Sequence, residues 1–293
     1  MNGIIIVNQN IGHNQYKINR FIPEFNSRGI KIDVFVNNGT LAKIENGEII
    51  INLPKADFVL YMDKDIYLAR MLEKAGYHLF NRADFIKMCD DKVLTFISCA
   101  NEGIKMIKTI AGPLVYTDTL EEENYSFLDT IEKEFGYPLI VKKVYGSLGE
   151  GVYIANDKNE LRDIYSKLYR NPLLFQKYIG TSRGKSVRVL IIDHEVVGGF
   201  ERYNTDDFRS NFGTTATSKK LENNSKFFEI AKILARKLDI LYAGLDFLYD
   251  ENDEPILCEI NSNAFFEEFE KVTGIDVAKY YVDMVIKECG KNE

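Results

Sequence analysis

Two carboxylates and one amide that together can bind a metal ion lie within residues 244–261. Both arms of this segment are mostly apolar, and the polar run between them is typical of a turn, so a β-hairpin is predicted. If the turn is centred on that polar run, Asp246 faces Glu259 with Cβ atoms about 5 Å apart. Asn261 points to the same face because strand side chains alternate with period two. Two like charges at this distance are destabilising unless a cation lies between them. Carboxylate and amide oxygens are ligands that suit Mg²⁺. The alternative is a solvated hairpin whose acidic residues face water.

The second candidate is a glycine-rich loop, residues 146–151, between an expected strand at residues 139–143 and a further β-rich run. Its three glycines can adopt positive φ angles and turn backbone N–H groups toward an anion. The loop matches neither the phosphate loop GxxxxGK[ST] nor a GxGxxG that opens a helix. We interpret it as a hairpin lid over phosphates, which Lys142 on the entering strand can reach. The alternative is a purely structural hairpin.

Two further strands carry candidate residues. Residues 173–179 form an apolar strand whose end could bind an adenine edge through its backbone, with Tyr178 and Ile179 as an apolar wall. An ordinary core strand would have the same pattern. Arg188 lies in an otherwise apolar strand, where a buried guanidinium needs an anion. That anion can be a protein carboxylate or a phosphate. Weaker candidates, because surface bases are common, are Arg202, Arg209, Lys219 and Lys220.

Composition restricts the classes of protein that this chain can belong to. Its 293 residues exceed what one core usually fills, so two or three subdomains are expected. The net charge of −7 argues against a general nucleic-acid or anionic-membrane binder. The four cysteines are widely spaced without a CxxC pair, which is typical of reduced thiols. No signal peptide and no apolar run of about 20 residues is present, so a cytoplasmic location is predicted.

The helices and strands expected to position these residues follow a different pattern in the N-terminal and C-terminal parts of the chain. A small open α/β sheet with mostly parallel strands is expected first, because short apolar runs alternate there with amphipathic stretches. Its strands are expected at residues 4–7, 32–36 and 58–62, and its helices at 16–28 and 66–74. Later helices are expected at residues 91–101, 120–135, 225–238 and 276–286. Strands otherwise dominate after residue 172, and the polar residues 204–221 are expected to form a mobile loop.

Along the chain, the glycine loop, the hinge strand, the arginine strand and the acidic hairpin follow one another. In this order they resemble the motifs of the ATP-grasp superfamily and specifically of the RimK-like amino-acid (glutamate) ligases. The resemblance covers about residue 84 to the C-terminus, and its most specific stretches are residues 206–211, 244–246, 259–262 and 271–276. It implies an α/β fold of the α+β ATP-grasp type. The expected domains are an N-terminal pre-ATP-grasp domain at 1–83, a central lobe with the lid at 84–171 and a C-terminal lobe with the metal site at 172–293.

The resemblance also implies a role for each matching residue. The ATP phosphates would meet Lys92 and Lys142, under a lid that includes Gly146, Ser147, Gly149 and Gly151. The adenine hinge would be Gln176, Lys177, Tyr178 and Ile179. Arg188 would stabilise the γ-phosphate and the acyl phosphate, while Arg209, Ser210 and Asn211 would close over nucleotide and intermediate. The Mg²⁺ ligands would be Asp246, Glu259 and Asn261, and Mn²⁺ could replace Mg²⁺.

Four departures from the family pattern are present, and the one at residues 212–215 argues against RimK's own protein substrate. RimK has acids where this chain has Ser186 and Lys177. It also has a His-Arg-Gly-Gly segment where this chain has residues 212–215. The small residues that usually follow the metal-binding asparagine are replaced by residues 263–266, which contain two phenylalanines. The pocket for the acceptor substrate is therefore expected to differ in shape.

The leading functional hypothesis is an ADP-forming carboxylate–amine ligase that acts through an acyl phosphate. Its partners would be ATP, the carboxylate of a small molecule or peptide, and an amino-acid amine such as that of L-glutamate. Such a reaction needs charge neutralisation, alignment and exclusion of water rather than a protein nucleophile. The alternative is a catalytically quiet ATP-binding regulatory module, although the complete set of candidate residues favours the enzyme. The sequence leaves the substrates and a homo-oligomeric state open.

Overall fold

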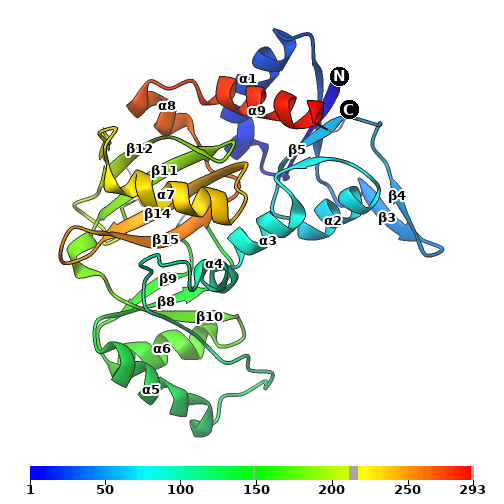
Figure 1. Ribbon diagram of the computed structural model, residues 1–293. Helices are drawn as coiled ribbons and strands as arrows, with labels where there is room; N and C mark the ends of the chain where they lie inside the picture. The colour runs from blue at the N-terminus through cyan, green and yellow to red at the C-terminus, as the bar shows by residue number, and fades with distance from the viewer. Residues whose placement is uncertain (148, 211–216, 292–293) are drawn as a thin grey trace.

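A computed structural model describes residues 1–147, 149–210 and 217–291 of the chain. Asn211 and residues 212–215, which the sequence analysis singled out, lie outside the described residues. The described chain forms three main sheets and a small hairpin, with helices packed on the sheets (Figure 1). This mixed architecture confirms the predicted α/β class.

The N-terminal sheet is parallel, in the order β2-β1-β5-β6. Its strands are β1 (Asn2–Val7), β2 (Lys31–Val36), β5 (Phe58–Met62) and β6 (Leu79–Phe80). Alternate side chains of β1 enter two different cores, because successive residues of a strand point to opposite faces. The helix α1 (Ile11–Asn26) covers one face and α2 (Ile66–Lys74) the other. The predicted open parallel sheet is therefore confirmed.

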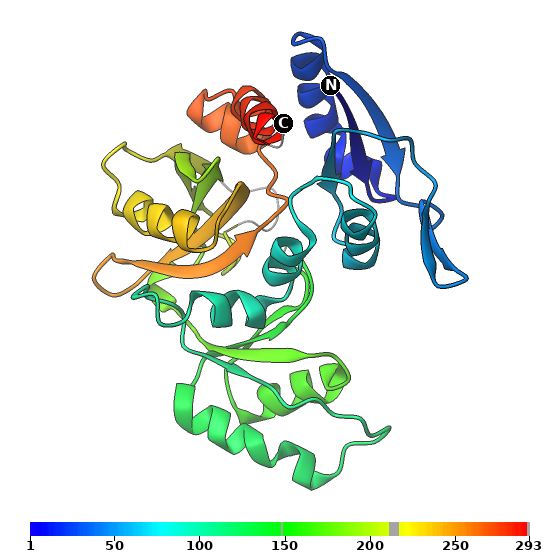
Figure 2. The ribbon, with the colours of Figure 1, turned by 45° about the vertical axis from the view of Figure 1, so that its right-hand side comes forward.

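The middle sheet is antiparallel, in the order β7-β10-β8-β9. Its strands are β7 (Thr109–Ala111), β8 (Leu139–Lys143), β9 (Val152–Ala155) and β10 (Leu173–Lys177). One face is covered by η1 (Glu122–Tyr125), α5 (Ser126–Phe135) and α6 (Lys158–Leu168), at the bottom of Figure 2. The expected boundary at residue 171 would cut β10 from its own sheet. The sheets divide after residue 177, because β10 pairs with both β7 and β8. The other domain limits stay a prediction.

The C-terminal sheet has five antiparallel strands in the order β13-β12-β11-β14-β15. The strands are β11 (Lys185–Ile192), β12 (Glu195–Tyr203), β13 (Thr217–Lys220), β14 (Tyr242–Tyr249) and β15 (Pro255–Asn261), and η2 (Gly180–Ser182) precedes them. Val187 and Val189 pack under α7 (Lys226–Lys237) on one face. Period-two alternation therefore turns Ser186 and Arg188 to the opposite face, where the candidate site lies.

The C-terminal helices pack between α1 and the C-terminal sheet. The helix α9 (Val277–Gly290) lies beside α1, and the ring centroids of Phe21 and Tyr281 are 4.8 Å apart (Figures 1 and 2). The shorter α8 (Glu267–Thr273) is tied to α1 by the ion pair between Arg20 and Glu270, with an Nε–Oε2 distance of 3.0 Å. Both ends of the chain thus build one wall of the molecule.

Several elements were not expected from the sequence. They are the hairpin β3 (Ala42–Glu45) and β4 (Glu48–Ile51), and the helix α3 (Ala83–Asp90), which precedes the expected α4 (Lys92–Cys99). The helices α6 and α8 were missed as well. The predicted loop at 204–221 is wrong at residues 217–220, where β13 pairs with β12. Its polar side chains suit an edge strand, which is half exposed and gives no apolar pattern.

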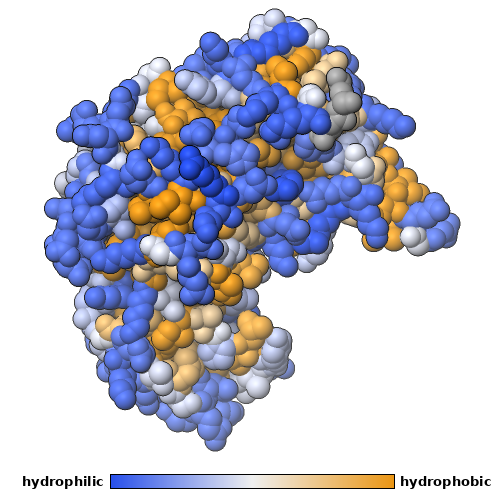
Figure 3. Space-filling view, viewed as in Figure 1, coloured by the Kyte–Doolittle hydropathy of each residue, from blue (hydrophilic) through white to orange (hydrophobic). Residues whose placement is uncertain are grey.

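The face shown in Figure 3 is largely hydrophilic, with apolar side chains exposed on the β3–β4 hairpin. Ile44 in this hairpin is 71% exposed. In the part of the chain that the structure describes, no helix combines the length and apolar character needed to cross a membrane.

Candidate active site

The candidate residues line one cavity of about 630 Å³. Its walls come from the middle and C-terminal sheets, from the start of α1 and from α3, α4 and α8. The volume is in the range typical of small-molecule sites. Every site residue predicted from the sequence lines this cavity except Gly151, which borders Lys143 instead, and Asn211, which lies outside the described residues. Candidates more than 160 residues apart in the sequence therefore share one site.

The acidic hairpin has the predicted opposition of carboxylates. Asp246 pairs with Glu259 across β14 and β15. The turn itself is displaced by half a residue from the predicted centre, since Phe247 pairs with Leu257. A β-bulge at Cys258 absorbs the difference and returns Asp246 and Glu259 to the same register. Bulges of this kind commonly re-aim side chains beside functional sites.

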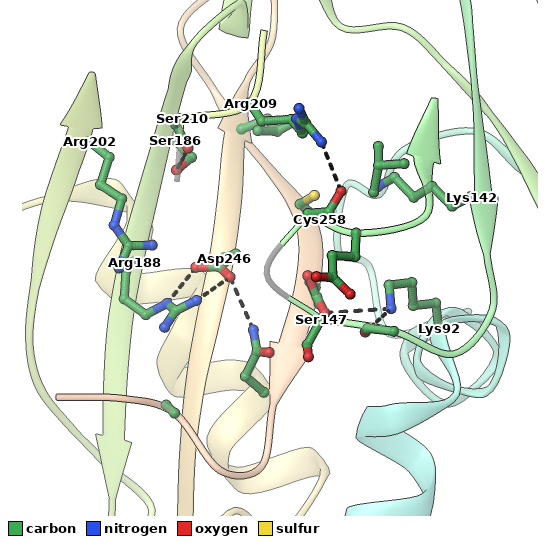
Figure 4. Close-up of a pocket in the computed structure, with 18 of the residues that line it drawn as sticks. Lys92, Lys142, Ser147, Ser186, Arg188, Arg202, Arg209, Ser210, Asp246 and Cys258 are labelled. Carbon is green, nitrogen blue, oxygen red and sulfur yellow. Dashed lines mark hydrogen bonds and ion pairs between the residues drawn. The ribbon is translucent and has the colours of Figure 1, made fainter. Parts of the chain in front are cut away.

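Arg188 supplies a positive charge next to the acidic pair. It lies opposite Asp246 in the β11–β14 register and donates from Nε to Oδ1 at 2.6 Å and from its terminal nitrogen to Oδ2 at 2.5 Å (Figure 4). Asn261 also donates to Asp246 Oδ2, at 3.0 Å. Burial is the largest effect on the pKa of Arg188 and lowers it, but the charge and hydrogen bonds of Asp246 outweigh burial and raise the pKa overall. Of the two alternatives for Arg188, the structure contains the protein ion pair.

The donor set of this hairpin fits a magnesium ion. Within the described residues, no group of three His, Cys, Asp or Glu side chains is close enough to hold a metal. The hairpin instead offers two carboxylates and one amide. Mg²⁺ is usually bound through one or two carboxylates together with waters and substrate phosphates, so such an incomplete protein set is what it requires.

Lys92 approaches the acidic pair from the side opposite to Arg188 (Figure 4). It is the first residue of α4, whose N-cap Asp91 accepts hydrogen bonds from two backbone N–H groups of the first turn. Its amine donates to Gly146 O at 2.7 Å and lies 3.9 Å from Glu259 Oε1. Burial lowers the pKa of Lys92, and Glu259 partly opposes this effect. Lys142 on β8 lines the same part of the cavity.

The glycine loop joins β8 and β9 as predicted, and its glycines adopt positive φ angles. The values are 144° at Gly146, 77° at Gly149 and 74° at Gly151. Gly149 O accepts a hydrogen bond from Arg209 at 3.0 Å. Arg209 is itself held by Asp207, which accepts from Nε and from a terminal nitrogen at 2.9 Å each. The loop before residue 211 therefore contacts the predicted lid directly.

The predicted adenine hinge carries a buried acceptor without a donor. Gln176 is 1% exposed, and its Nε2 donates to Thr109 Oγ1 at 2.8 Å. Its Oε1 has no hydrogen-bond partner among the described residues. Ile107 and Leu248 also line this end of the cavity and add apolar surface. A buried acceptor beside apolar walls fits an aromatic base with an exocyclic amino group, such as adenine.

The departures from RimK have identifiable environments. Ser186 replaces an acid, and its Oγ lies 2.5 Å from Oγ of Ser210. This contact joins β11 to the loop that carries Arg209. Lys177 is exposed at the end of β10 and lines the cavity. Phe265 also lines it and is 41% exposed, so an aromatic side chain forms part of the wall after the predicted metal-binding asparagine.

Sequence reasoning missed two groups of lining residues. Arg202 was only a weak candidate, yet it is buried and donates from Nε to Glu268 Oε2 at 2.9 Å. Its pairing with Ser186 across β11 and β12 puts it on the face of Arg188, which the period-two rule could have indicated. The second group comes from the start of α1 and comprises Asn8, His13 and Asn14. Asn14 lies four residues before Ile18 and seven before Phe21, so helical periodicity could have indicated its buried position. Nothing in the local sequence distinguishes Asn8 and His13 from surface residues.

Comparisons with known proteins agree with this architecture. The model of the RimK-like ATP-grasp domain matches residues 89–285. Human beta-citrylglutamate synthase B is 30% identical over 272 residues, covering 89% of this chain and 68% of that protein. Human N-acetylaspartylglutamate synthase A is 31% identical over 223 residues, covering 75% and 55%. A structure of the ATP-grasp ligase PsnB complexed with minimal precursor, Mg and ADP has a TM-score of 0.69 at 16% identity, covering 98% of this chain and 97% of that one.

The fold and the site together define an ATP-grasp protein. The chain belongs to the RimK-like ATP-grasp family. It is an ATP-dependent ligase that forms carbon–nitrogen bonds between a carboxylate and an amine. The resemblance stated from the sequence motifs is thereby confirmed.

Proposed function

We propose that this ligase activates a carboxylate of a small molecule or peptide as an acyl phosphate and joins it to an amino-acid amine, that of L-glutamate first of all. The observation that carries the proposal is the convergence of Arg188, Lys92 and the Asp246–Glu259 pair in one cavity with the hinge. The choice of glutamate rests on the names of two relatives, both of which denote synthases of glutamate-containing products.

The proposed reaction has two steps. A carboxylate oxygen of the substrate attacks the γ-phosphorus of ATP, so that ADP leaves and an acyl phosphate forms. The amine nitrogen then attacks the acyl carbon. The carbon–nitrogen bond forms, the carbon–oxygen bond to phosphate breaks, and the amine loses its proton to the solvent. Neither step requires a protein nucleophile, because positioning and neutralisation of charge are the main contributions in phosphoryl transfer.

Each candidate residue has a role in this proposal. Lys92 and Lys142 would neutralise the ATP phosphates, and Gln176 to Ile179 would hold the adenine. Arg188 would stabilise the charge that develops during transfer, together with the loop of Arg209, Ser210 and Asn211. Bound Mg²⁺, held by Asp246, Glu259 and Asn261, would supply further neutralisation of phosphate charge. Mn²⁺ could take its place, because it also accepts oxygen ligands.

The test is ADP release by the purified protein with Mg-ATP. A panel of carboxylates, including citrate, N-acetylaspartate and short acidic peptides, is combined with a panel of amino acids. We expect release that requires both an acid and an amino acid, glutamate above all. The mass of the product should equal the sum of the two substrates less one water. Release that needs no amine, or no release with any pair, would contradict the proposal.

The predicted lid leads to a second expected result. Gly149→Val should lower turnover by about 10-fold or more, because a β-branched residue resists a φ of 77° and distorts the loop over the phosphates. The matched control is Gly47→Val in the β3–β4 turn, where φ is 82° and no atom lies within 4 Å of the added Cβ. Both variants should lose similar stability in thermal melts. Equal turnover in the two variants would argue against a role of the loop in the reaction.

A further inference from the structure

Asn14 is a buried polar residue whose hydrogen-bonding capacity is only half used. It lies in the first turns of α1 and is 1% exposed. Its Nδ2 donates to Met62 O at 3.3 Å, which fixes the side chain against β5. Its Oδ1 has no hydrogen-bond partner in the described part of the chain, although Asn14 lines the cavity. A buried acceptor without a donor is costly, so a native protein usually satisfies it with water or a ligand.

The cavity extends continuously from Arg188 to this residue. A Cβ added to Gly244 would lie 3.0 Å from Arg188 Cδ and 2.8 Å from Ala264 Cβ, so Ala264 borders the arginine. Asn263 and Phe265 flank Ala264 and also line the cavity. Phe265 meets the His13 ring edge to face at a centroid distance of 6.1 Å. This end of the cavity, which we call the α1 arm, comprises Asn8, His13, Asn14, Asn263, Ala264 and Phe265.

The α1 arm is held in place by Lys17, one turn further along α1. The Lys17 amine donates to the backbone oxygen of Asn263 at 3.0 Å and to its Oδ1 at 2.5 Å. It also lies 4.9 Å from the centroid of the Phe265 ring. Asn263 is therefore occupied by a protein donor, in contrast to Asn14. These contacts border the arm, and Asn14, whose Oδ1 is buried without a donor in the described part of the chain, lines the same cavity.

We infer that the α1 arm is the subsite for the amine substrate, and that Asn14 Oδ1 accepts a hydrogen bond from an N–H of that amine. The inference rests on the proposed function. The reacting carboxylate of the acid substrate presents acceptor oxygens and belongs beside Arg188 and the metal-binding hairpin. An acceptor such as Asn14 Oδ1 suits the N–H groups of the incoming nucleophile instead. The exposed ring of Phe265 can pack against the carbon chain of an amino acid.

The experiment compares three variants of the full chain, with ADP release as the readout and the best substrate pair from the panel. Asn14→Leu removes the acceptor and keeps the branching of the side chain, and Asn14→Asp keeps an acceptor oxygen but loses the donor to Met62. Asn19→Leu is the matched control, because Asn19 is an exposed residue of the same helix outside the cavity, where its Oδ1 accepts from Gln15 Nε2. If Asn14→Leu does not fold, Asn14→Ala removes the same oxygen.

We expect Asn14→Leu to raise KM for the amine by about tenfold or more, with KM for ATP changed by less than about twofold. Asn14→Asp should retain an amine KM near that of the wild type, and Asn19→Leu should change neither constant. An unchanged KM for the amine in Asn14→Leu would overturn the subsite but not the proposed function. Equal increases in KM for ATP and for the amine would have the same meaning, as would an increase in KM for the acid alone. Equal losses in the Leu and Asp variants would show that only the bond to Met62 matters. Absence of amine-dependent ADP release from wild type would instead overturn the proposed function itself, and the subsite with it.

Discussion

Glu259→Gln should reduce Mg²⁺-dependent turnover by about 10³-fold, because a bound metal contributes several kcal/mol to charge neutralisation in phosphoryl transfer. The fold should survive the change. Glu259 pairs directly with Asp246 across the hairpin, so loss of its charge also removes a repulsion between like charges. The measurement is ADP release across a range of Mg²⁺ concentrations, beside thermal melts with and without Mg-ATP. Wild type should gain thermal stability from Mg-ATP and the variant should gain much less.

The matched control for this variant is Glu254→Gln. Glu254 lies in the turn of the same hairpin and forms an exposed ion pair with Lys226, with an Nζ–Oε1 distance of 2.8 Å. We expect this control to keep wild-type turnover and the wild-type response to Mg²⁺. Near-normal activity of Glu259→Gln at saturating Mg²⁺ would remove Glu259 from the metal site.

Arg188→Ala should lower turnover by about 10²-fold or more, which is a typical cost of losing one electrostatic stabiliser of a transition state. ATP affinity should change much less, because Lys92, Lys142 and the hinge still contact the nucleotide in the proposed mode. The variant should also be less stable, by about 1–3 kcal/mol, since the partly buried Asp246 loses its bidentate partner. ADP release and direct ATP titration, both below the melting temperature of the variant, separate these effects.

Two variants make the result specific to the site. Arg188→Lys keeps the charge but not the two parallel hydrogen bonds, so it should recover more stability than turnover. Arg162→Ala removes a comparable bidentate pair on the surface, where the guanidinium donates to Glu122 at 2.9 Å and 2.8 Å. That control should leave both activity and ATP binding near wild type. A loss of ATP affinity as large as the loss of turnover would assign Arg188 to nucleotide binding instead.

Much of the site could be predicted from the sequence because its parts depend on short-range geometry. The period of two along a strand places Asp246, Glu259 and Asn261 on one face whatever the sheet around them. The glycine loop was predicted correctly for a similar reason, since positive φ angles at closely spaced glycines and strands on both sides are local properties. The apolar runs of β1 and β5 likewise indicated a buried parallel sheet.

Tertiary structure decided which of these parts meet. Lys92 lies 3.9 Å from Glu259 across a separation of 167 positions, and no local pattern encodes that approach. The membership of β10 in the middle sheet depends on ladders with strands distant in the sequence, and a short apolar strand is compatible with several partners. Asn14 shows the same limit most clearly. Its residue type suggests exposure, although it lies four residues before Ile18 on the buried face of α1. Its hydrogen bond to Met62 O of β5 and its place in the cavity come from tertiary packing. Sequence determines the face and the backbone geometry of each element, while burial and convergence come from long-range contacts spread over many residues.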